Sequence, residues 1–531
     1  MFTDRRPDPS LRGQGPIAEW YKDQSVFITG ASGFMGKVLL EKLLFQCNGI
    51  KSIYILIRSK RGRSHEQRIE DMWKLPMFDR LKQYEPNASK KVILIQGDCL
   101  TENLGLNDAD FKLLTGKVSV VFHFAATLKL EAKLKDAIEM NTGGTERVLN
   151  LAKQMKNLKS FVHLSTAFCS ADLDEFRESV YRTNDNPKEV LQVTRWMKDD
   201  ALEIATPSII YPHPNTYTYT KRLAETLVAD EYPNLPVVIA RPSIVTPSAV
   251  EPIPGWVDSL NGPMGISIAA GKGVIRSMLV KADSRAQVVP VDVACNALIV
   301  IAWKMGTTID RPAEIPVYNM TNDGVIQLTW GQVLNIGREV AYKYPFEGQI
   351  WYPDGDMRSS RIVHQIYCLL FHWIPAYFID LLMFIFRQKR FMVRLMQRID
   401  NGLELLQFFT TRDWYFESKK FLALTTGMSP LERKVYQMDF DAVPVEEYFT
   451  LCLLGARQYL MKENLKTIPR ARRVQFVLYL IDRAFTIAFY LGLIWMVYSY
   501  SDAVKGVLDG VGSTLHNVPV IRSFIPHNTK M

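Results

Sequence analysis

The chain has 531 residues, of which 47% are hydrophobic, so it is too long for one ordinary domain and too apolar for a disordered protein. Its net charge of +9 favours anionic partners such as phosphorylated cofactors or membrane surfaces. Nucleic acid is not expected as a partner, because no Lys/Arg block carries interleaved aromatic residues. Six scattered cysteines without a C-x-x-C pair predict reduced thiols, no metal site and a catalytic part that faces the cytosol.

The chain begins with a polar leader, residues 1–20, which has no apolar core of the kind that a secretory signal requires. An apolar run, SVFI, follows, and the pattern Thr29-Gly30-x-x-Gly33-x-x-Gly36 then opens an apolar helical stretch. In a strand, glycine turn and helix of this order, backbone N–H groups and the positive helix end can hold a pyrophosphate. Glycines also serve tight turns and close packing, so the context decides. We expect a dinucleotide to bind at these four residues.

Basic residues follow the second predicted strand. The stretch RSKRGR, Arg58 to Arg63, stands where a NAD-binding domain usually carries an Asp or Glu for the ribose hydroxyls. Cations there favour a 2′-phosphate and therefore predict NADP, with a solvated basic loop as the alternative. After the third strand, Asp98 is placed to accept a hydrogen bond from an adenine amine, although an Asp that caps a turn has the same signature.

Short β-branched runs alternate with helical patterns from residue 25 to about residue 241. Near-continuous apolar strands separated by helices are typical of a parallel sheet covered on both faces. We therefore predict a doubly wound α/β domain of the Rossmann type over residues 21–344, in which residues 245–344 form a smaller substrate-covering region. The further strand runs are SIYILI from residue 52, KVILIQGD from 91, VSVVFHFAA from 118, SFVHLSTA from 160 and PVVIARPS from 236.

The chemistry is predicted from NTYTYTKRLAE, in which Tyr217 and Lys221 share one face of a helix. A neighbouring ammonium favours the phenolate, which makes the tyrosine a proton donor and acceptor near neutral pH. Tyr219 lies two residues on and is expected to point elsewhere. Thr166, just beyond the fifth strand run, can hydrogen-bond the substrate oxygen, and Ser165 is the competing candidate. Together these residues predict a carbonyl-reducing triad.

From residue 345 the strand signals fade, and long apolar and aromatic stretches predict a helical domain over residues 345–466. His364 and His372 lie eight residues apart beside Asp380, without a Cys or Glu partner that would complete a metal shell. We expect packing or capping roles for them. Apolar, aromatic helices of this kind are more often core than binding surface.

A basic linker, residues 467–483, precedes residues 484–501, AFTIAFYLGLIWMVYSYS, which carry no charge across eighteen residues. This length allows one transmembrane helix, and the arginines before it favour a cytoplasmic N-terminal end. A buried helix is the alternative, because Asp482 and Arg483 interrupt the longer apolar run. The prediction is a single C-terminal pass with residues 502–531 as a tail.

The motifs TGASGFMG, VFHFAA, NTGGTERVL, STA, YTYTK and ARPSIV resemble the extended short-chain dehydrogenase/reductases. More narrowly, PNTYTYTKRLAE, the stretch RPSIVTPSAVEPIPGWVDSLNGPMG and the C-terminal FHWIPAYFIDLL are similar to the alcohol-forming fatty acyl-CoA reductases of the male-sterility family. The similarity runs from about residue 21 to residue 465. It breaks at FRQKRFM, residues 386–392, where Arg-x-x-Gly-x-Lys-Pro is more usual, and this difference bears on acyl-chain preference more than on chemistry.

The resemblance implies Tyr217 and Lys221 as catalytic residues and Ala125 behind the nicotinamide. It also implies that a segment of three residues closes over the cofactor: Pro242, Ser243 and Ile244. The other implied cofactor contacts are Gly30, Gly33, Phe34, Met35, Gly36, Arg58 and Asp98.

The reaction implied by the resemblance is NADPH-dependent reduction of a long-chain fatty acyl-CoA through an aldehyde to a primary alcohol, with release of CoA. The implied partners are the acyl-CoA and a lipid bilayer, that of the endoplasmic reticulum, the peroxisome or the lipid droplet; no oligomeric state is indicated. A membrane-bound steroid or sterol dehydrogenase is the alternative enzyme, but it would lack the helical domain. A membrane-tethered scaffold with a vestigial nucleotide fold is the non-enzymatic alternative, which the intact Tyr/Lys pair disfavours.

Overall fold

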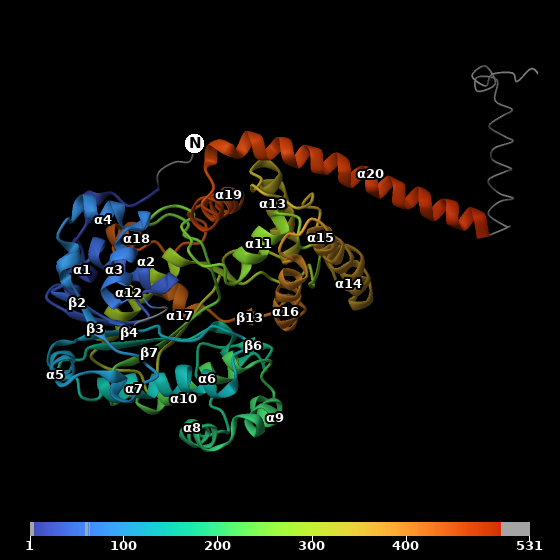
Figure 1. Ribbon diagram of the computed structural model, residues 1–531. Coiled ribbons are helices and arrows are strands. Elements are labelled where there is room, and N and C mark those ends of the chain that lie inside the picture. Colours follow the sequence, from blue (N-terminus) through green and yellow to red (C-terminus); the bar gives the residue numbers. More distant parts are fainter. Residues whose placement is uncertain (1–4, 59–61, 63, 501–531) are drawn as a thin grey trace, which may run out of the picture.

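The centre of the molecule is a seven-stranded parallel sheet in the order β11-β7-β5-β4-β1-β2-β3 (Figure 1). The structure is a computed structural model that describes residues 5–58, 62 and 64–500. The strand order reverses between β1 and β4, and a crevice for ligands is expected at the carboxyl ends of these two strands. The strands are β1 (Ser25–Thr29), β2 (Ser52–Ile57), β3 (Val92–Gln96), β4 (Val120–His123), β5 (Ser160–Leu164), β7 (Val237–Pro242) and β11 (Val317–Met320).

Helices cover both faces of the sheet, because alternate side chains of the strands are apolar on both sides. In β1, Val26 and Ile28 belong to one buried core, whereas Phe27 belongs to the other. Figure 1 shows the two layers on opposite sides of the strands. One layer holds α1 (Pro16–Tyr21), α2 (Phe34–Gln46), α3 (His65–Trp73), α4 (Asp79–Tyr84) and α12 (Val291–Thr307); the other holds α5 (Asp108–Lys117), α6 (Leu134–Ala137), α7 (Gly144–Ala152), α8 (Pro187–Trp196), α9 (Asp199–Ile210) and α10 (Thr216–Asp230).

The doubly wound prediction is confirmed, and the predicted strand runs begin within two residues of the observed strands. The seventh strand, β11, lies in the region expected only to cover the substrate, and it extends the sheet at the edge beside β7. That region also contains α11 (Pro263–Gly271) and α13 (Trp330–Lys343). Three two-stranded sheets connect distant segments: β8 (Ile244–Thr246) with β10 (Val288–Pro290), β9 (Ser277–Leu279) with β12 (Asp356–Arg358), and β6 (Glu175–Phe176) with β13 (Tyr415–Phe416).

The C-terminal helices do not gather into one separate body. Phe421, Val435 and Tyr436 belong to the same core as α2 and α12 of the nucleotide-binding half. Leu453 of α19 packs into a core with residues of α11 and α13. The helices are α14 (Arg361–Cys368), α15 (Ile374–Ile385), α16 (Met392–Thr410), α17 (Lys419–Leu422), α18 (Pro430–Val435) and α19 (Val445–Gly455).

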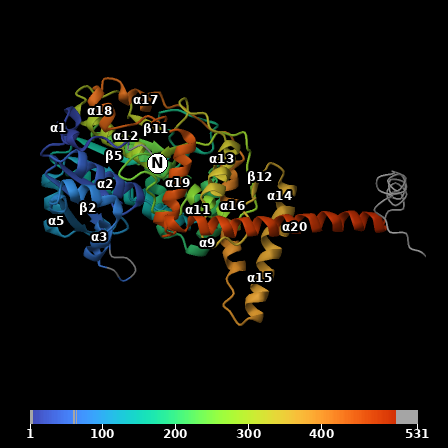
Figure 2. The same ribbon diagram turned by 90° about the horizontal axis from the view of Figure 1, so that it is seen from above.

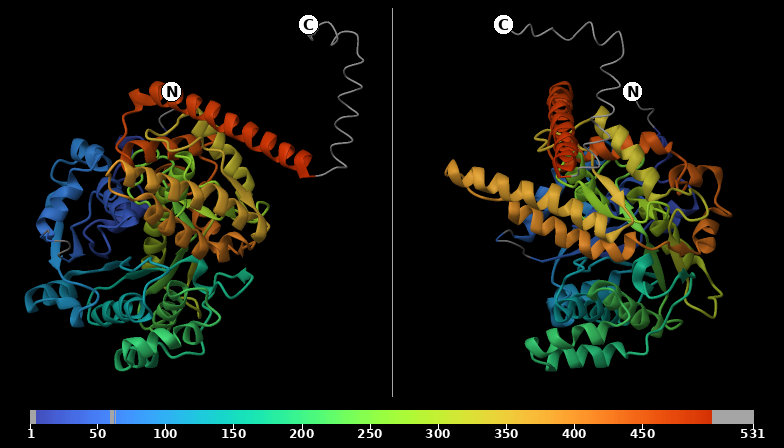
Figure 3. Two further views of the ribbon diagram at one scale, coloured as in Figure 1. Left: turned by 45° about the vertical axis from the view of Figure 1, so that its right-hand side comes forward. Right: turned by 90° about the vertical axis from the view of Figure 1, so that its right-hand side faces the viewer.

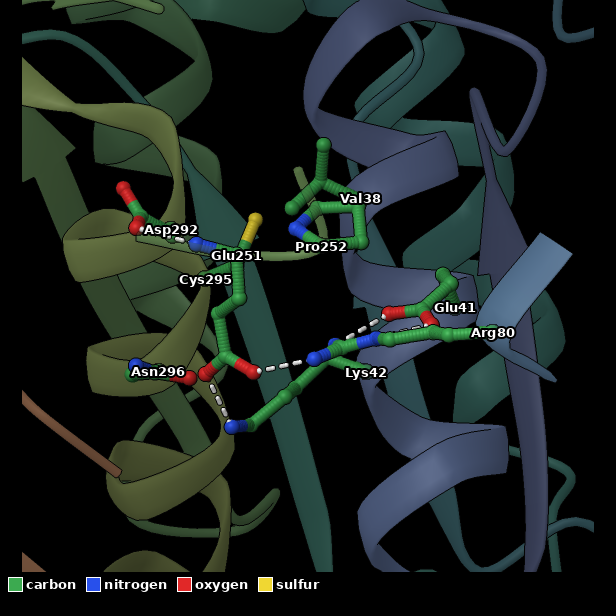
Figure 4. Close-up of a pocket in the computed structure, with 9 residues that line it drawn as sticks. All are labelled: Val38, Glu41, Lys42, Arg80, Glu251, Pro252, Asp292, Cys295 and Asn296. Carbon is green, nitrogen blue, oxygen red and sulfur yellow. Dashed lines mark hydrogen bonds and ion pairs between the residues drawn. The ribbon is translucent and has the colours of Figure 1, made fainter. Parts of the chain in front are cut away.

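A buried network of charges joins the two halves (Figure 4). The ammonium of Lys42 on α2 contacts the carboxylate of Glu251 and donates to the carbonyl of Val435 at 2.7 Å. Arg80 donates to both carboxylate oxygens of Glu41 at 2.8 Å and to Glu251 at 2.9 Å. Every charge in this cluster therefore has a partner of opposite sign, which is what burial of an ionic group requires.

The last described element is α20 (Ile468–Tyr500), a single helix of 33 residues. The segment expected as a basic linker is thus the first half of this helix. The helix can continue through Asp482 and Arg483 because the body of the protein supplies polar partners for both side chains. Asp482 accepts from the indole of Trp351 at 2.5 Å, and Arg483 pairs with Asp354. The second half runs on beyond the body (Figure 1). Ser501 and the predicted tail lie outside the described residues.

Candidate functional site

The glycine turn lies between β1 and α2, at the reversal of the strand order. Gly30 has a φ of +75°, and a Cβ there would lie 2.9 Å from the backbone nitrogen of Ala125. A Cβ on Gly36 would lie 2.3 Å from the carbonyl oxygen of Gly30, so this residue must be small for the helix to approach the turn. Gly33 is exposed and occupies the N-cap of α2. The turn therefore presents bare backbone and a helix N-terminus to the crevice.

The hydroxyl of Thr29 connects the glycine turn to the end of β4. It accepts hydrogen bonds from the backbone N–H groups of Phe124 and Ala125, both at 3.2 Å, and it lies 2.8 Å from Nδ1 of His123. The side chain is completely buried. Thr29 thus positions Ala125, and its predicted contact with the cofactor stays a prediction.

Two arginines converge beside the glycine turn. Arg58 Nη1 donates to Asp98 Oδ2 at 3.0 Å, and Arg68 Nη2 donates to the hydroxyl of Ser32 in the turn at 2.9 Å. Arg68 also donates to the carbonyl of Arg58, and its pKa is lowered by partial burial and by the charge of Arg58. Asp98 therefore pairs with Arg58, and its predicted contact with an adenine stays a prediction. Of the predicted basic loop, Ser59, Lys60, Arg61 and Arg63 lie outside the described residues.

Arg68 was not among the predicted site residues. It lies on α3 and reaches back over the end of β2, so it joins Arg58 at one end of the crevice. The signal was present in HEQR, which places a cation near the start of a helix that follows the basic loop. Like charges repel one another, so the guanidinium groups of Arg58 and Arg68 favour an anion between or beside them.

The triad residues meet at the carboxyl end of β5. Asn215 caps α10 by accepting from the N–H of Thr218 at 2.9 Å, and this fixes Tyr217 and Lys221 on the face toward β5. Lys221 Nζ donates to the carbonyl of Leu164, the last residue of the strand, at 2.7 Å. The side chain of Thr166 lies beside the phenol of Tyr217 and lowers its pKa.

The competing serine has a free hydroxyl. Ser165 Oγ is buried and has no hydrogen-bond partner among the described residues, and the nearby Glu225 is held by Arg241 in a buried pair with an Nε to Oε1 distance of 2.8 Å. Tyr219 donates to Asp185 at 2.8 Å, away from the triad as expected. Thr166 therefore lies beside Tyr217, whereas Ser165 stays a candidate to bind the substrate oxygen.

Burial shifts the pKa values of both Tyr217 and Lys221. Burial raises the pKa of Tyr217 above its ordinary value, and the hydrogen bond from Thr166 offsets part of this rise. Burial also lowers the pKa of Lys221 to about 8, and the negative Glu225 opposes that shift. The predicted effect of Lys221 on the pKa of Tyr217 stays a prediction; the raised pKa favours the protonated phenol, which is the form that a proton donor needs.

Two buried histidines support the site from beneath. Burial and then the charge of Lys221 lower the pKa of His123 to about 3, and the same two causes hold the pKa of His163 well below its usual range. His123 bridges Thr29 and Thr145, with its Nε2 3.1 Å from the Thr145 hydroxyl. Both imidazoles are therefore neutral near neutral pH and add no positive charge near Lys221.

The predicted closing segment begins where β7 ends. Pro242 is the last residue of β7, Ser243 donates its backbone N–H to Met320 at 3.0 Å, and Ile244 starts β8. The hydroxyl of Ser243 is buried and has no partner among the described residues. Phe34 and Met35, predicted to contact the cofactor, form the partly buried first turn of α2 next to Gly33.

The histidines of the C-terminal half have structural partners. Nε2 of His372 accepts from the backbone of Arg276 at 2.8 Å, and Nδ1 of His364 lies 2.9 Å from the hydroxyl of Ser277. Asp380 accepts from the N–H groups of Phe391 and Met392 at the start of α16. Among the described residues, no group of three or more His, Cys, Asp and Glu is arranged to hold a metal ion.

Comparison with known proteins identifies families and relatives that this chain resembles. Residues 28–298 match a nucleotide-binding family described as male sterility protein, and residues 371–463 match a second family with the same description. Fatty acyl-CoA reductase 1 of Xenopus laevis is 35% identical over 86% of this chain and 88% of its own length. The human protein of that name is 34% identical over the same shares, and fatty acyl-CoA reductase wat of Drosophila melanogaster is 32% identical over 92% of this chain and 94% of its own.

Solved structures of reductase domains share the fold. The terminal R domain of the myxalamid biosynthetic pathway aligns with a TM-score of 0.53 at 18% identity, over 84% of this chain and 93% of that domain. The R domain of a nonribosomal peptide synthetase from Mycobacterium tuberculosis aligns with a TM-score of 0.52 at 16% identity, over 86% of this chain and 93% of that domain.

Proposed function

Because this chain belongs to the fatty acyl-CoA reductases of the male-sterility family, we propose that it reduces a long-chain fatty acyl-CoA to a primary alcohol with NADPH. The observation that carries the proposal is the convergence of Thr166, Tyr217 and Lys221 at the end of β5, beside a glycine turn with no side chains in the way. This combination suits hydride transfer to a carbonyl followed by protonation of its oxygen.

The residues present fit a dinucleotide phosphate. The backbone cradle at Gly30 and Gly33 would hold the pyrophosphate, and a side chain at Gly30 would collide with Ala125. Arg58 and Arg68 would hold the 2′-phosphate, which supports NADPH over NADH. The buried hydroxyl of Ser243, which has no partner among the described residues, would be free to bind the cofactor as the resemblance implies.

In the first reduction, the chain's own residues manage the charge on the thioester oxygen. NADPH, when bound, supplies the hydride. Tyr217 donates its proton to the oxygen that becomes negative, and Thr166 orients the phenol and shares the same oxygen. Lys221 holds the ribose and adds a positive charge near the phenol. The resulting hemithioacetal expels CoA thiol and leaves an aldehyde.

The second reduction uses the same residues. The aldehyde takes up a second hydride, Tyr217 again donates the proton, and a primary alcohol results. Each round therefore consumes one hydride and one proton, so complete reduction of the acyl-CoA requires two cofactor molecules and releases one CoA.

Incubation of the full chain with NADPH and a panel of acyl-CoAs, followed by mass analysis of the products, tests the proposal. We expect long-chain primary alcohols and free CoA, with two NADPH consumed per alcohol. A steroid or sterol dehydrogenase would leave every acyl-CoA intact in this assay and would instead reduce a ketosteroid supplied with NADPH in a parallel reaction. Recovery of aldehyde alone would restrict the activity to the first reduction.

We also propose that the second half of α20 anchors the enzyme in a bilayer with the catalytic body in the cytosol. The helix has a mean hydropathy of 1.7 over its apolar window, and Ile487, Trp495 and other large apolar residues in it are exposed. A chain that ends at Arg483 keeps the contacts of Asp482 and Arg483 with the body. We expect this shortened chain to be extracted from membranes by alkaline carbonate, whereas the full chain remains; retention of both would contradict anchoring by α20.

A further inference from the structure

The segment from α14 to α15 is built with its polar side inward. Its buried side chains recur every fourth residue, and large apolar residues occupy most of its remaining surface, with Arg361 and Gln365 as exposed polar residues near its start. Phe378, for example, is 58% exposed and Leu381 53% exposed. A helix on a water-soluble surface shows the opposite arrangement. The buried side chains are His364, Cys368, His372, Ala376 and Asp380, and the exposed apolar ones are Ile362, Val363, Ile366, Leu369, Leu370, Phe371, Ile374, Tyr377, Phe378, Leu381, Leu382, Phe384 and Ile385.

The inward polar side chains are explained by partners within the protein. His364 and His372 bind β9 and the residue before it, and Asp380 caps α16. These bonds fix the rotation of the segment about its own axis. The apolar side therefore cannot turn inward without loss of several buried hydrogen bonds. In the described part of the chain, nothing covers it.

The position of the segment relative to α20 indicates what covers this apolar side. Figure 2 shows α15 running across the direction of α20, and the right-hand view of Figure 3 looks along α20 while α15 is seen from the side and protrudes from the body. Contacts of α20 with the body reach Phe485, whose ring lies 5.7 Å from that of Trp351. If α20 crosses a bilayer, a helix that runs across it lies along the bilayer surface.

Charges at the end of the segment match a lipid surface. Arg387, Lys389 and Arg390 are exposed directly after α15, and Arg394 and Arg398 are exposed on α16. An apolar helix face beside a row of cations is the pattern of a helix that lies in the interface of an anionic bilayer. The same cations disfavour a transmembrane path for the α15–α16 pair, although residues 361–385 are long and apolar enough to span, with a mean hydropathy of 1.8.

We propose that residues 361–385 form an in-plane membrane helix, a second contact with the bilayer besides α20. The apolar face enters the acyl region, the polar stripe remains bound to the body, and the cations contact anionic headgroups. Because α15 and α20 run in different directions, contact of both helices with the bilayer prevents the body from rotating about the axis of α20. The orientation rests on the membrane anchoring proposed above, but the contact itself does not depend on the catalytic assignment.

The test uses the full chain with one added cysteine at a time, in vesicles of phosphatidylcholine and phosphatidylserine. Phe378→Cys reports on α15, Ile487→Cys reports on α20, and Trp196→Cys, at a position that is 84% exposed on α8, reports on the body. Each variant is labelled with a water-soluble maleimide before and after addition of detergent, and the unsubstituted chain gives the background. We expect Trp196→Cys to react equally in both states, and the other two to react at least tenfold faster in detergent.

Each outcome decides between the two proposals. If Phe378→Cys reacts in vesicles as fast as Trp196→Cys while Ile487→Cys is protected, the in-plane helix is refuted and the anchor stands. If Ile487→Cys reacts and Phe378→Cys is protected, the anchor fails and the in-plane helix stands. Fluorophores on cysteines at Ile366, Phe378 and Ile385, with quenchers at known lipid depths, add the orientation: equal shallow depths support an in-plane helix, and a gradient of depth refutes it.

Discussion

Two buried lysines of this enzyme serve different purposes. Lys42 and Lys221 are 2% and 3% exposed. Lys42 contacts Glu251 and donates to Val435 within a cluster whose charges are all paired (Figure 4). Lys221 donates to Leu164, the one hydrogen bond that the described residues provide for its ammonium, which has three donors. Both lysines are buried, so burial alone does not distinguish them. The unused donors of Lys221 leave it able to bind a ligand, whereas Lys42 stabilises the fold.

The largest effect is expected at the triad. Tyr217→Phe removes the transferable proton and leaves the ring in place, so alcohol formation should fall roughly 100- to 10,000-fold. NADPH binding, measured by fluorescence titration, should change little. Tyr219→Phe is the matched control, because its hydroxyl binds Asp185 and not the substrate. Near-normal turnover by the Tyr217 variant would remove this residue from the mechanism.

Substitution of each lysine by methionine tests the comparison directly. Lys42→Met leaves Glu251 with one buried partner fewer and should lower the free energy of unfolding by about 3–5 kcal/mol. Lys221→Met should leave the unfolding temperature in the same detergent unchanged or raised, because burial of the ammonium outweighs the attraction of Glu225 and no described carboxylate forms an ion pair with it. The variant should weaken NADPH binding and slow turnover. The comparison fails if both variants lose stability equally.

A smaller effect is expected at the arginines beside the glycine turn. If Arg58 binds the 2′-phosphate, Arg58→Ala loses a charge-assisted hydrogen bond worth about 1.5–3 kcal/mol and should raise the KM for NADPH roughly 10- to 100-fold. The KM for NADH should change little. Arg182→Ala is the control, since this exposed arginine pairs with Asp230 elsewhere on the surface. Equal losses for both cofactors would argue against a 2′-phosphate site.

The smallest effect concerns pH. The pKa of Lys221 is lowered by burial to about 8, so its ammonium loses the proton as pH rises through that value. We expect kcat/KM for NADPH to fall above about pH 8, because a neutral amine holds the ribose less well. Lys221→Arg should move this decline to higher pH, since a guanidinium stays protonated.

Measurements of the free energy of unfolding distinguish this decline in kcat/KM from unfolding of the protein. An unfolded lysine has a pKa of about 10.4, so between about pH 8 and 10 the unfolded chain binds a proton that the folded chain lacks. The contribution of Lys221 to the free energy of unfolding therefore rises with pH in the range where the rate falls. Denaturant melts at pH 7.5 and 9.5, compared with those of Lys221→Met, measure this contribution; a rate that fell together with this contribution would point to another group.

Much of the sheet and of the triad could be predicted from local patterns. Apolar runs set the strands, and the four-residue spacing of Tyr217 and Lys221 set their common helix face. Which of Thr166 and Ser165 lies beside Tyr217 could not be predicted, because that contact depends on how α10 packs against the end of β5. Arg68 was missed for a similar reason, since its contact with Ser32 joins two elements that the sequence keeps 36 residues apart.

The C-terminal half shows the limit of periodicity. A repeat of four predicts two faces for α14 and α15 but not which one is inside, and apolar helices were expected to be core. The inner face is the one that carries His364, His372 and Asp380, because these side chains bind groups at β9 and at the start of α16. The two histidines reach partners 87 and 96 residues away in the sequence. In the same way, Asp482 and Arg483 seemed to interrupt a membrane helix, whereas they attach its first half to the body.

The bond from Lys42 to Val435 also sets an order of events during synthesis. Its two residues are 393 positions apart, so a ribosome must add those residues before the ammonium on α2 meets this carbonyl. At roughly 5–20 residues per second this takes on the order of half a minute. Until Val435 has been added, the ammonium of Lys42 lacks this carbonyl partner, and the apolar second half of α20 follows Val435 in the chain.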